Sequence, residues 1–286
     1  MKREIKNSFE IKLEFAPNTK NPFRLFQSYA EIIDGITSIN SVITRSVNSD
    51  YTKELILEDL EKGSIVGKFI DWITVNEDDT IDNIKDNEAI NSYIHESRNE
   101  TLKFIENKKY KVSELKELKE KLEDIAAKQE IKNTFNYASP GLIDLAKSIN
   151  QIVNSTKKLN DTEKYTFATS NDMINVDNKS QTIDIEKVEE ELTENEIITQ
   201  KEAYYKIKKP DFLGNTQWEF KHGNTSPKAK ISHQAWLDGF LAGKIPVVPG
   251  DSLKVLVKQT TKYDKNGYVL FDKFEIVEVL EVIHNN

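Results

Sequence analysis

The stretch WEFKHGNTSPKAKISHQAWLDGF, Trp218 to Phe240, indicates how the C-terminal part of the chain folds. Trp218 and Phe220 lie two residues apart, so their side chains point to the same face of a strand. Trp236 and Phe240 lie four residues apart and share one face of a short helix. Because buried aromatic residues dominate small cores, we expect these four rings to meet inside a small domain.

Strand patterns lie on both sides of this stretch. Alternating residues from Tyr204 to Ile207 precede it, and the dipeptide Asn266-Gly267 separates two alternating runs that follow it. Asn-Gly between such runs is typical of a β-hairpin turn. We therefore predict a small β-rich domain of about five strands with one short helix over residues 200–286.

The ends of that short helix also have sequence signals. Ser232 is expected to cap a helix that begins at His233, because a serine hydroxyl accepts a hydrogen bond from the first turn. Gly243 is expected to end the helix near Ala242, because glycine readily adopts the left-handed conformation that follows a last turn.

The N-terminal residues alternate and then become helical. Phe9, Ile11 and Leu13 predict a half-buried strand. Asn21-Pro22 predicts the start of a helix that runs to about Val47. The apolar stripe expected to face the core consists of Phe23, Phe26, Ala30, Ile33, Ile36, Ile39 or Asn40, and Ile43.

Glycine in the middle of this helix needs an explanation. Gly35 costs roughly 1 kcal/mol relative to alanine at the same helical position. The helix is therefore expected either to bend there or to pack closely against another element.

The fold class follows from the order of the next elements. Alternating residues predict two strands, Leu55 to Leu60 and Ile65 to Trp72, distorted at or joined by Gly63. Three amphipathic helices follow: one over Glu88–Glu106, one capped by Ser113 and one that begins at Ser139-Pro140. Strand, long helix, strand, strand and small helical bundle predict an α+β fold with an antiparallel sheet.

A shorter segment separates these two parts. Tyr165 and Phe167 alternate, and Asp177-Asn178 predicts a hairpin turn before Ile183. The acidic run Glu186 to Glu196 is read either as a solvated helix or as a linker. We therefore predict an α+β domain over residues 1–160, a hairpin and acidic connector over residues 161–199, and the β-rich domain over residues 200–286.

Composition excludes several classes of site. The chain has 286 residues, no cysteine and a net charge of −8. Without cysteine it has no disulfide, zinc–thiolate site or cysteine-ligated iron–sulfur cluster. No apolar run is long enough to suggest a signal peptide or a membrane helix, so a cytoplasmic protein without membrane contact is expected.

No catalytic motif is present. The sequence lacks the P-loop, the dinucleotide-binding glycine motif, the nucleophile elbow and the zinc-protease HExxH motif. Asp78-Asp79 is a pair of acids that can bind magnesium, although a surface turn is the simpler interpretation. His222 and His233 lack a third ligand for a metal. No catalytic residue, metal site or cofactor is therefore predicted.

A candidate interaction patch is predicted in the β-rich domain. Residues 200–286 contain 13 basic and 10 acidic groups, whereas residues 165–199 contain 2 basic and 9 acidic groups. Alternating lysines on a strand can follow a phosphate backbone while an exposed aromatic ring stacks on a base. The patch consists of Trp218, Lys221, His222, Lys228, Lys230 and His233.

Two parts of the chain resemble a family of bacterial and phage-associated proteins of unknown function. INSVITRSV (Ile39 to Val47) and LEDLEKGSIVGKF (Leu57 to Phe69) are similar to its N-terminal domain. The segment from Asp211 to Val257, with a tryptophan-bearing strand, KAKI, a short helix and PGD, is similar to its C-terminal domain. The resemblance implies a pairing of two domains and an association with phages, mobile elements and antiphage defence, and it implies no reaction.

Three functions are therefore weighed. The first is a non-enzymatic sensor, adaptor or regulator from a prophage, mobile element or antiphage-defence locus. It would bind a protein partner, and a homo-oligomer through the long helix or the helical middle is plausible. The alternative is a single-stranded nucleic-acid-binding protein that uses the β-rich domain. The third is a metal-dependent hydrolase or nuclease that uses Asp78 and Asp79.

Overall fold

The computed structural model describes residues 3–16, 19–47, 52–60, 65–75, 84–105, 110–134, 137–169, 172–212, 216–223 and 225–285. The chain has the predicted α+β class, and it divides into two compact units, Met1–Val188 and Glu189–Asn286. The pairs Gly63-Ser64 and Asp78-Asp79 lie outside the described residues.

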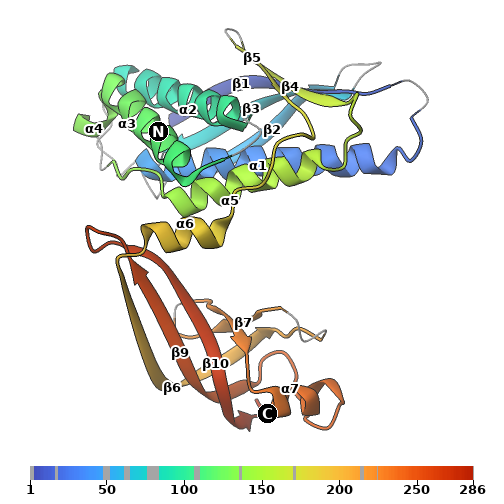
Figure 1. Ribbon diagram of the computed structural model, residues 1–286, viewed down its shortest axis with the longest axis vertical. Helices are drawn as coiled ribbons and strands as arrows, with labels where there is room; N and C mark the ends of the chain where they lie inside the picture. The colour runs from blue at the N-terminus through green and yellow to red at the C-terminus, as the bar shows by residue number, and fades with distance from the viewer. Residues whose placement is uncertain are drawn as a thin grey trace. The chain divides into compact units, whose positions relative to one another are not determined.

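The first unit contains a five-stranded antiparallel sheet (Figure 1). Its strands, in the order β2-β3-β1-β4-β5, are β1 (Arg3–Glu14), β2 (Thr52–Leu60), β3 (Ile65–Val75), β4 (Lys164–Ala168) and β5 (Met173–Val176). Phe9, Ile11 and Leu13 alternate along β1 and are buried, as their period of two predicts.

The hairpin β4–β5 completes this sheet, because β4 pairs with β1 over Glu10–Glu14. Sequence patterns place the hairpin in a segment between two domains and put its turn at Asp177-Asn178. The hairpin predicted at Asp177-Asn178 is wrong: the chain turns beside Asn178, but Ile183 is in no strand, and β5 pairs instead with β4, which precedes it. Pairing with a strand about 150 residues earlier has no local sequence signal, so only the folded chain shows it.

Helices cover one face of the sheet (Figure 1). They are α1 (Phe23–Val47), α2 (Ile84–Ile105), α3 (Val112–Lys128), α4 (Ile131–Thr134) and α5 (Leu142–Thr156), and α6 (Ile185–Leu192) spans the division between the units. The Tyr29 hydroxyl on α1 donates a hydrogen bond of 2.8 Å to the Ile11 carbonyl on β1. The guanidinium of Arg98 on α2 lies 4.1 Å from the centre of the Phe9 ring.

Gly35 allows α1 and α5 to approach closely. A Cβ atom built at this position would lie 2.6 Å from Cγ1 of Ile152 on α5, well inside van der Waals contact. Close packing, the second of the two explanations given for this glycine, is therefore confirmed.

The stripe predicted to bury α1 is wrong at its beginning. Phe23 and Phe26 are 72% and 60% exposed and Ala30 is exposed as well, whereas Leu25 and Tyr29 are buried. Apolar residues lie on two neighbouring stripes of this helix, and the sheet and α5 cover the stripe that also contains Ile32. Periodicity alone does not decide between two stripes that lie side by side.

Three predicted helix starts are also displaced. The N-cap of α3 is Lys111, so Ser113 lies inside the first turn. The N-cap of α5 is Gly141, and the Ser139 hydroxyl instead donates to Glu123 at 2.5 Å. Ser232 likewise bonds to the Glu275 carboxylate on another strand, and the N-cap of the following helix is His233. For Ser139 and Ser232, an acceptor elsewhere in the fold thus competes with local capping for the hydroxyl.

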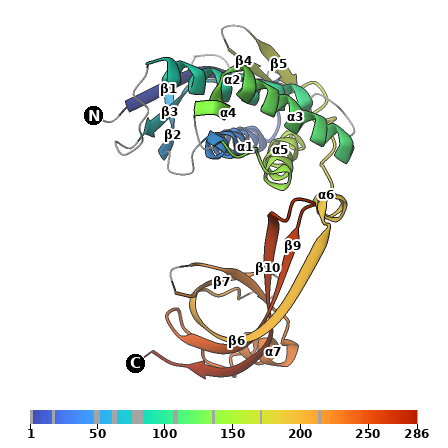
Figure 2. The ribbon, with the colours of Figure 1, turned by 90° about the vertical axis from the view of Figure 1, so that its left-hand side faces the viewer.

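The second unit is a closed barrel in the order β10-β8-β7-β6-β9 (Figure 2). Its elements are β6 (Asn195–Lys209), β7 (Trp218–Lys221), β8 (Lys228–Ile231), α7 (Gln234–Leu241), β9 (Ser252–Tyr263) and β10 (Val269–Ile283). Strands β8 and β10 pair in parallel and the other neighbours pair antiparallel. Five strands with these connections and a helix between the third and fourth have the topology of an OB-fold.

Aromatic rings fill the barrel, as the opening stretch predicts. Trp218 is 1% exposed, and its ring centre lies 4.9 Å from that of Phe240 and 5.9 Å from that of Trp236. Phe220 belongs to the same core cluster. Gly243, with φ of +71°, follows α7 and ends it as predicted.

Candidate functional site

The outer surface of three adjacent barrel strands is rich in lysine. Tyr205 and Ile207 on β6 and Phe220 on β7 point inward, so the residues between them point outward. Strand β8 alternates in the same way. Residues 204–209 of β6 together with β7 and β8 supply six exposed lysines, which we call the lysine face: Lys206, Lys208, Lys209, Lys221, Lys228 and Lys230.

Strand register brings these charges together. Lys206 lies directly opposite Lys221 across the β6–β7 pair. Like charges in directly opposed positions destabilise a sheet, so barrel stability does not explain this pair. An anionic ligand would offset their mutual repulsion.

One carboxylate lies among the lysines in these strand segments. Glu219 on β7 accepts a hydrogen bond of 2.5 Å from Nζ of Lys208, and its Oε2 lies 3.9 Å from Nζ of Lys209. Lys228 lies opposite it in the β7–β8 register. The hydrogen bond from Lys208 lowers the pKa of Glu219, and the nearby lysine charges act in the same direction. The side chain is therefore a charged acceptor at neutral pH.

Two exposed aromatic side chains accompany the lysine face. Tyr204 on β6 is 58% exposed and precedes Lys206 by two residues, so it points outward with it. Its carbonyl oxygen lies 3.0 Å from Nδ1 of His222, whose ring packs 5.1 Å from that of Tyr205. Phe212, which follows β6, is 67% exposed and stacks on Phe240.

A pocket adjoins the lysine face where β6 leads into β7. Its volume is about 460 Å³. We call it the β6–β7 pocket, and it is lined by Lys209, Pro210, Asp211, Thr216, Gln217, Glu219 and Lys228. Two carboxylates, which only accept hydrogen bonds, and two ammonium groups, which only donate them, thus line one concave surface.

The predicted patch is divided between the surface and the interior of the barrel. Lys221, Lys228 and Lys230 belong to the lysine face, but Trp218 is buried in the core and offers no surface for stacking. His233 serves the fold, because its Nδ1 accepts a hydrogen bond of 3.0 Å from the Val279 amide.

Sequence reasoning missed half of the lysine face. Lys206, Lys208 and Lys209 lie in the run YYKIKK, whose alternation was used only to predict a strand. Combining that alternation with the outward lysines of KAKI would have indicated a surface shared by two strands. Strands β6 and β8 are not neighbours, however, and they share a surface only because β7 pairs with both of them in the barrel.

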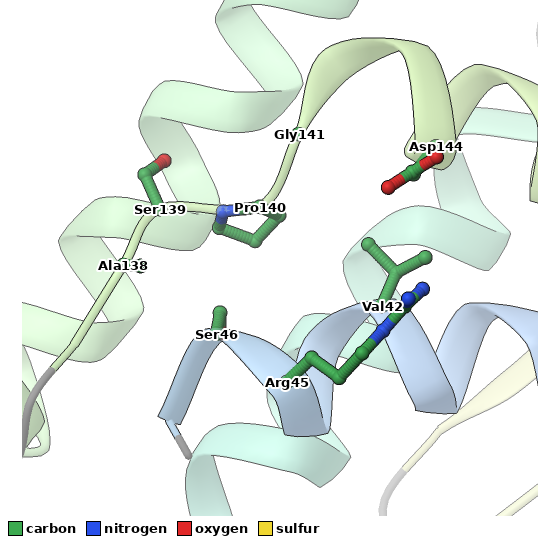
Figure 3. Close-up of a pocket in the computed structure, with 8 residues that line it drawn as sticks. All are labelled: Val42, Arg45, Ser46, Ala138, Ser139, Pro140, Gly141 and Asp144. Carbon is green, nitrogen blue, oxygen red and sulfur yellow. The ribbon is translucent and has the colours of Figure 1, made fainter. Parts of the chain in front are cut away.

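A second pocket, of about 200 Å³, lies at the start of α5 in the first unit (Figure 3). Figure 3 shows the Asp144 carboxylate in its wall, where it would repel an anion drawn to the helix N-terminus. The Ser46 hydroxyl bonds to the Ile43 carbonyl and to the Tyr93 hydroxyl. The serines of this pocket, including Ser139, thus bond within the fold.

Metal-binding and membrane-spanning features were sought in the same residues. In the described ranges, no group of three or more histidine, aspartate or glutamate side chains is arranged to hold a metal ion. Asp78 and Asp79 fall outside those ranges. Within the described part of the chain, no helix combines the length and apolar character that a membrane crossing requires.

Comparison with protein-family models, with curated proteins and with solved structures gave no match. Neither an activity nor a binding partner is therefore transferred to this chain from a relative. The lysine face, the β6–β7 pocket and the barrel topology are the features from which a function is argued.

Proposed function

We propose that this protein binds single-stranded nucleic acid through the lysine face of its barrel. The observation that supports this most directly is the charge of three adjacent strands. Over residues 204–209, 218–221 and 228–231 they carry six lysines and one glutamate outside the core, in a chain whose net charge is −8. A positive surface concentrated in this way favours a phosphate backbone, because binding releases the counterions condensed on it.

Barrel topology supports the same ligand class. In OB-folds, the face of the second and third strands and the adjoining loops bind oligonucleotides or oligosaccharides. The corresponding strands here are β7 and β8, which supply Lys221, Lys228 and Lys230. An oligosaccharide without charge would leave the lysines unpaired, so a polyanion fits this face better.

Exposed aromatic residues favour a single strand over a duplex. The Tyr204 ring lies on the same outer surface as Lys206, and a base that is not paired can stack on it. A duplex hides the faces of its bases and presents only phosphates and groove edges. We therefore expect a single strand to bind more tightly than a duplex of the same length.

Direct titration tests the proposal. Fluorescence anisotropy would measure the dissociation constants of labelled DNA and RNA strands of about 15 nucleotides, close to the upper site size of one such barrel. We expect the triple variant K206Q/K221Q/K230Q to lose at least about tenfold in affinity, because three phosphate contacts are removed.

A matched variant controls for net charge. Lys116, Lys121 and Lys147 are exposed on α3 and α5 of the first unit. The variant K116Q/K121Q/K147Q changes the net charge by the same amount and is expected to bind like the wild type. Equal losses in both triple variants, or no binding of any strand at low salt, would refute the proposed function.

A second proposal concerns protein–protein contacts. The exposed rings of Phe23 and Phe26, 72% and 60% exposed, form an apolar surface on α1. Such a surface supports a role as sensor, adaptor or regulator that self-associates through the long helix. Light scattering over a range of concentrations should show a dimer that F23S/F26S converts to a monomer. A monomer at every wild-type concentration would refute self-association.

The genomic setting remains a proposal from sequence resemblance. A prophage, mobile element or antiphage-defence locus is consistent with a binder of single-stranded nucleic acid, because replication and recombination of such elements expose single strands. Gene neighbourhood tests this directly: flanking housekeeping genes in each genome that encodes the chain would contradict it.

A further inference from the structure

Phe212 is an exposed ring that the barrel core holds in place. It lies just beyond β6, on the connection to β7, and is 67% exposed. Its ring centre lies 5.5 Å from that of Phe240, the two ring planes differ by 28°, and Phe240 belongs to the buried core cluster. One face of the Phe212 ring therefore rests on the core, and the large exposed fraction leaves the other face open to solvent.

A ring held in this way is suited to stacking. Burial of apolar area stabilises a fold in proportion to the area removed from water, and Phe212 has little of its area removed. A flat aromatic face that is open to solvent instead accepts a second ring in an offset stack. Contact with Phe240 already fixes the side chain, so binding a base costs little further conformational entropy.

The chain places Phe212 beside the lysine face. The two residues directly before it line the β6–β7 pocket together with Lys209 and Lys228. Tyr204, the exposed ring on β6, precedes Phe212 by eight residues, and the β6 lysines lie between the two along the chain. At about 3.3 Å per extended residue, the two α-carbons are at most about 26 Å apart. A strand of several nucleotides can therefore reach both rings.

We propose that Phe212 is a second base-stacking residue and that a bound single strand follows β6 from Tyr204 to Phe212. One base stacks on each ring, and the phosphates between them contact Lys206 and its neighbours on the lysine face. This inference rests on the proposed binding of single strands. It adds a requirement on the ligand, which must be an oligonucleotide that carries bases at both rings and not phosphates alone.

A strand without bases tests this requirement, because it retains every phosphate. Anisotropy titrations compare labelled (dT)15 with a 15-mer of abasic sites at the same salt concentration. The wild type is expected to bind (dT)15 at least about 25-fold more tightly, since each base stacked on an aromatic ring contributes at least about fivefold. Binding of the abasic 15-mer measures the lysine face by itself.

Two variants of Phe212 separate stacking from a structural role. F212A should weaken binding of (dT)15 at least about fivefold and leave the affinity for the abasic 15-mer unchanged. F212L retains an apolar contact with Phe240 but has no aromatic face, so it should show the same selective loss at a wild-type melting temperature. The matched control is Y268A, because Tyr268 is 71% exposed on the turn between β9 and β10, outside the lysine face. Y268A should bind both strands like the wild type.

The outcomes distinguish this inference from the proposed function. Equal wild-type affinities for the two strands, or a preference for (dT)15 that survives in both Phe212 variants, would overturn stacking on Phe212 while leaving the lysine face as a binding surface. Equal losses on both strands, or a loss as large in Y268A, would also overturn it. Failure of both strands to bind the wild type would end the inference together with the proposed function.

Discussion

Salt dependence is the prediction that depends most directly on the lysine face. The face has six lysines, and one of them, Lys208, is neutralised by its 2.5 Å contact with Glu219. About five phosphate contacts are therefore available. For a single strand the logarithm of the binding constant falls with the logarithm of salt concentration at about −0.7 per contact, which gives a slope of about −3.5.

This slope predicts a large change in binding affinity over salt concentrations that are easy to reach in a titration. Raising the salt concentration from 50 to 200 mM should weaken binding of (dT)15 by about 130-fold. The variant K206Q/K221Q/K230Q retains about two contacts, so its slope should be about −1.4 and the same change in salt should weaken binding by about sevenfold.

Anisotropy titrations of labelled (dT)15 at four or five salt concentrations measure both slopes. K116Q/K121Q/K147Q, with its changes on α3 and α5, should retain the wild-type slope. A wild-type slope near zero would show that the strand does not contact the lysines. Equal slopes for the wild type and the lysine-face variant would show that the contacts lie elsewhere in the protein.

Three further predictions concern the interior of the two units. Trp218→Ala should lower the free energy of unfolding of the barrel by about 3–5 kcal/mol, because it empties the centre of the core. Urea denaturation followed by tryptophan fluorescence measures this change, and a loss below about 1 kcal/mol would contradict the prediction. Gly35→Ala should destabilise the first unit by about 1–2 kcal/mol, because the overlap with Ile152 outweighs the gain in helix propensity, and a raised melting temperature would contradict this. The hydrogen bonds from Arg24 lower the pKa of Glu163 below its ordinary value of 4.5, so the stability from this pair should be present above about pH 4.5 and lost as the pH falls further. Glu163→Gln should therefore be less stable at pH 7 and less sensitive to acid in helix melts followed by circular dichroism, and parallel pH profiles for the two proteins would contradict this.

Elements with a local cause were predictable from sequence. The alternation of Phe9, Ile11 and Leu13 predicted β1, because a strand places successive side chains on opposite faces. The spacing of Trp218, Phe220, Trp236 and Phe240 predicted a shared aromatic core, which the ring distances confirm. Gly35 in the middle of α1 predicted a bend or a close helix contact, but the sequence did not identify Ile152 on α5 as the residue in contact.

The sequence did not predict which of two neighbouring side chains would be buried, or which acceptor a hydroxyl would bind. The first turns of α1 contain both Leu25 and Phe26, and each belongs to an apolar stripe of helical period. Only the placement of the sheet and α5 decides that Leu25 is buried and Phe26 is exposed. The Ser139 hydroxyl likewise bonds to Glu123 because a tertiary acceptor is within reach.

The alternation of inward rings and outward lysines follows from the order of residues alone, since it depends only on the period of each strand. The folded barrel is needed to show that the lysines of β6, β7 and β8 form one surface and that Glu219 lies among them. The three strands follow one another along the chain and pair antiparallel, but the register that places Lys206 opposite Lys221 and Glu219 opposite Lys228 follows from the packing of Trp218 and its neighbours in the core. The core contacts of the inward side chains therefore set the positions of the outward lysines, and the spacing of lysines in the sequence does not show this register.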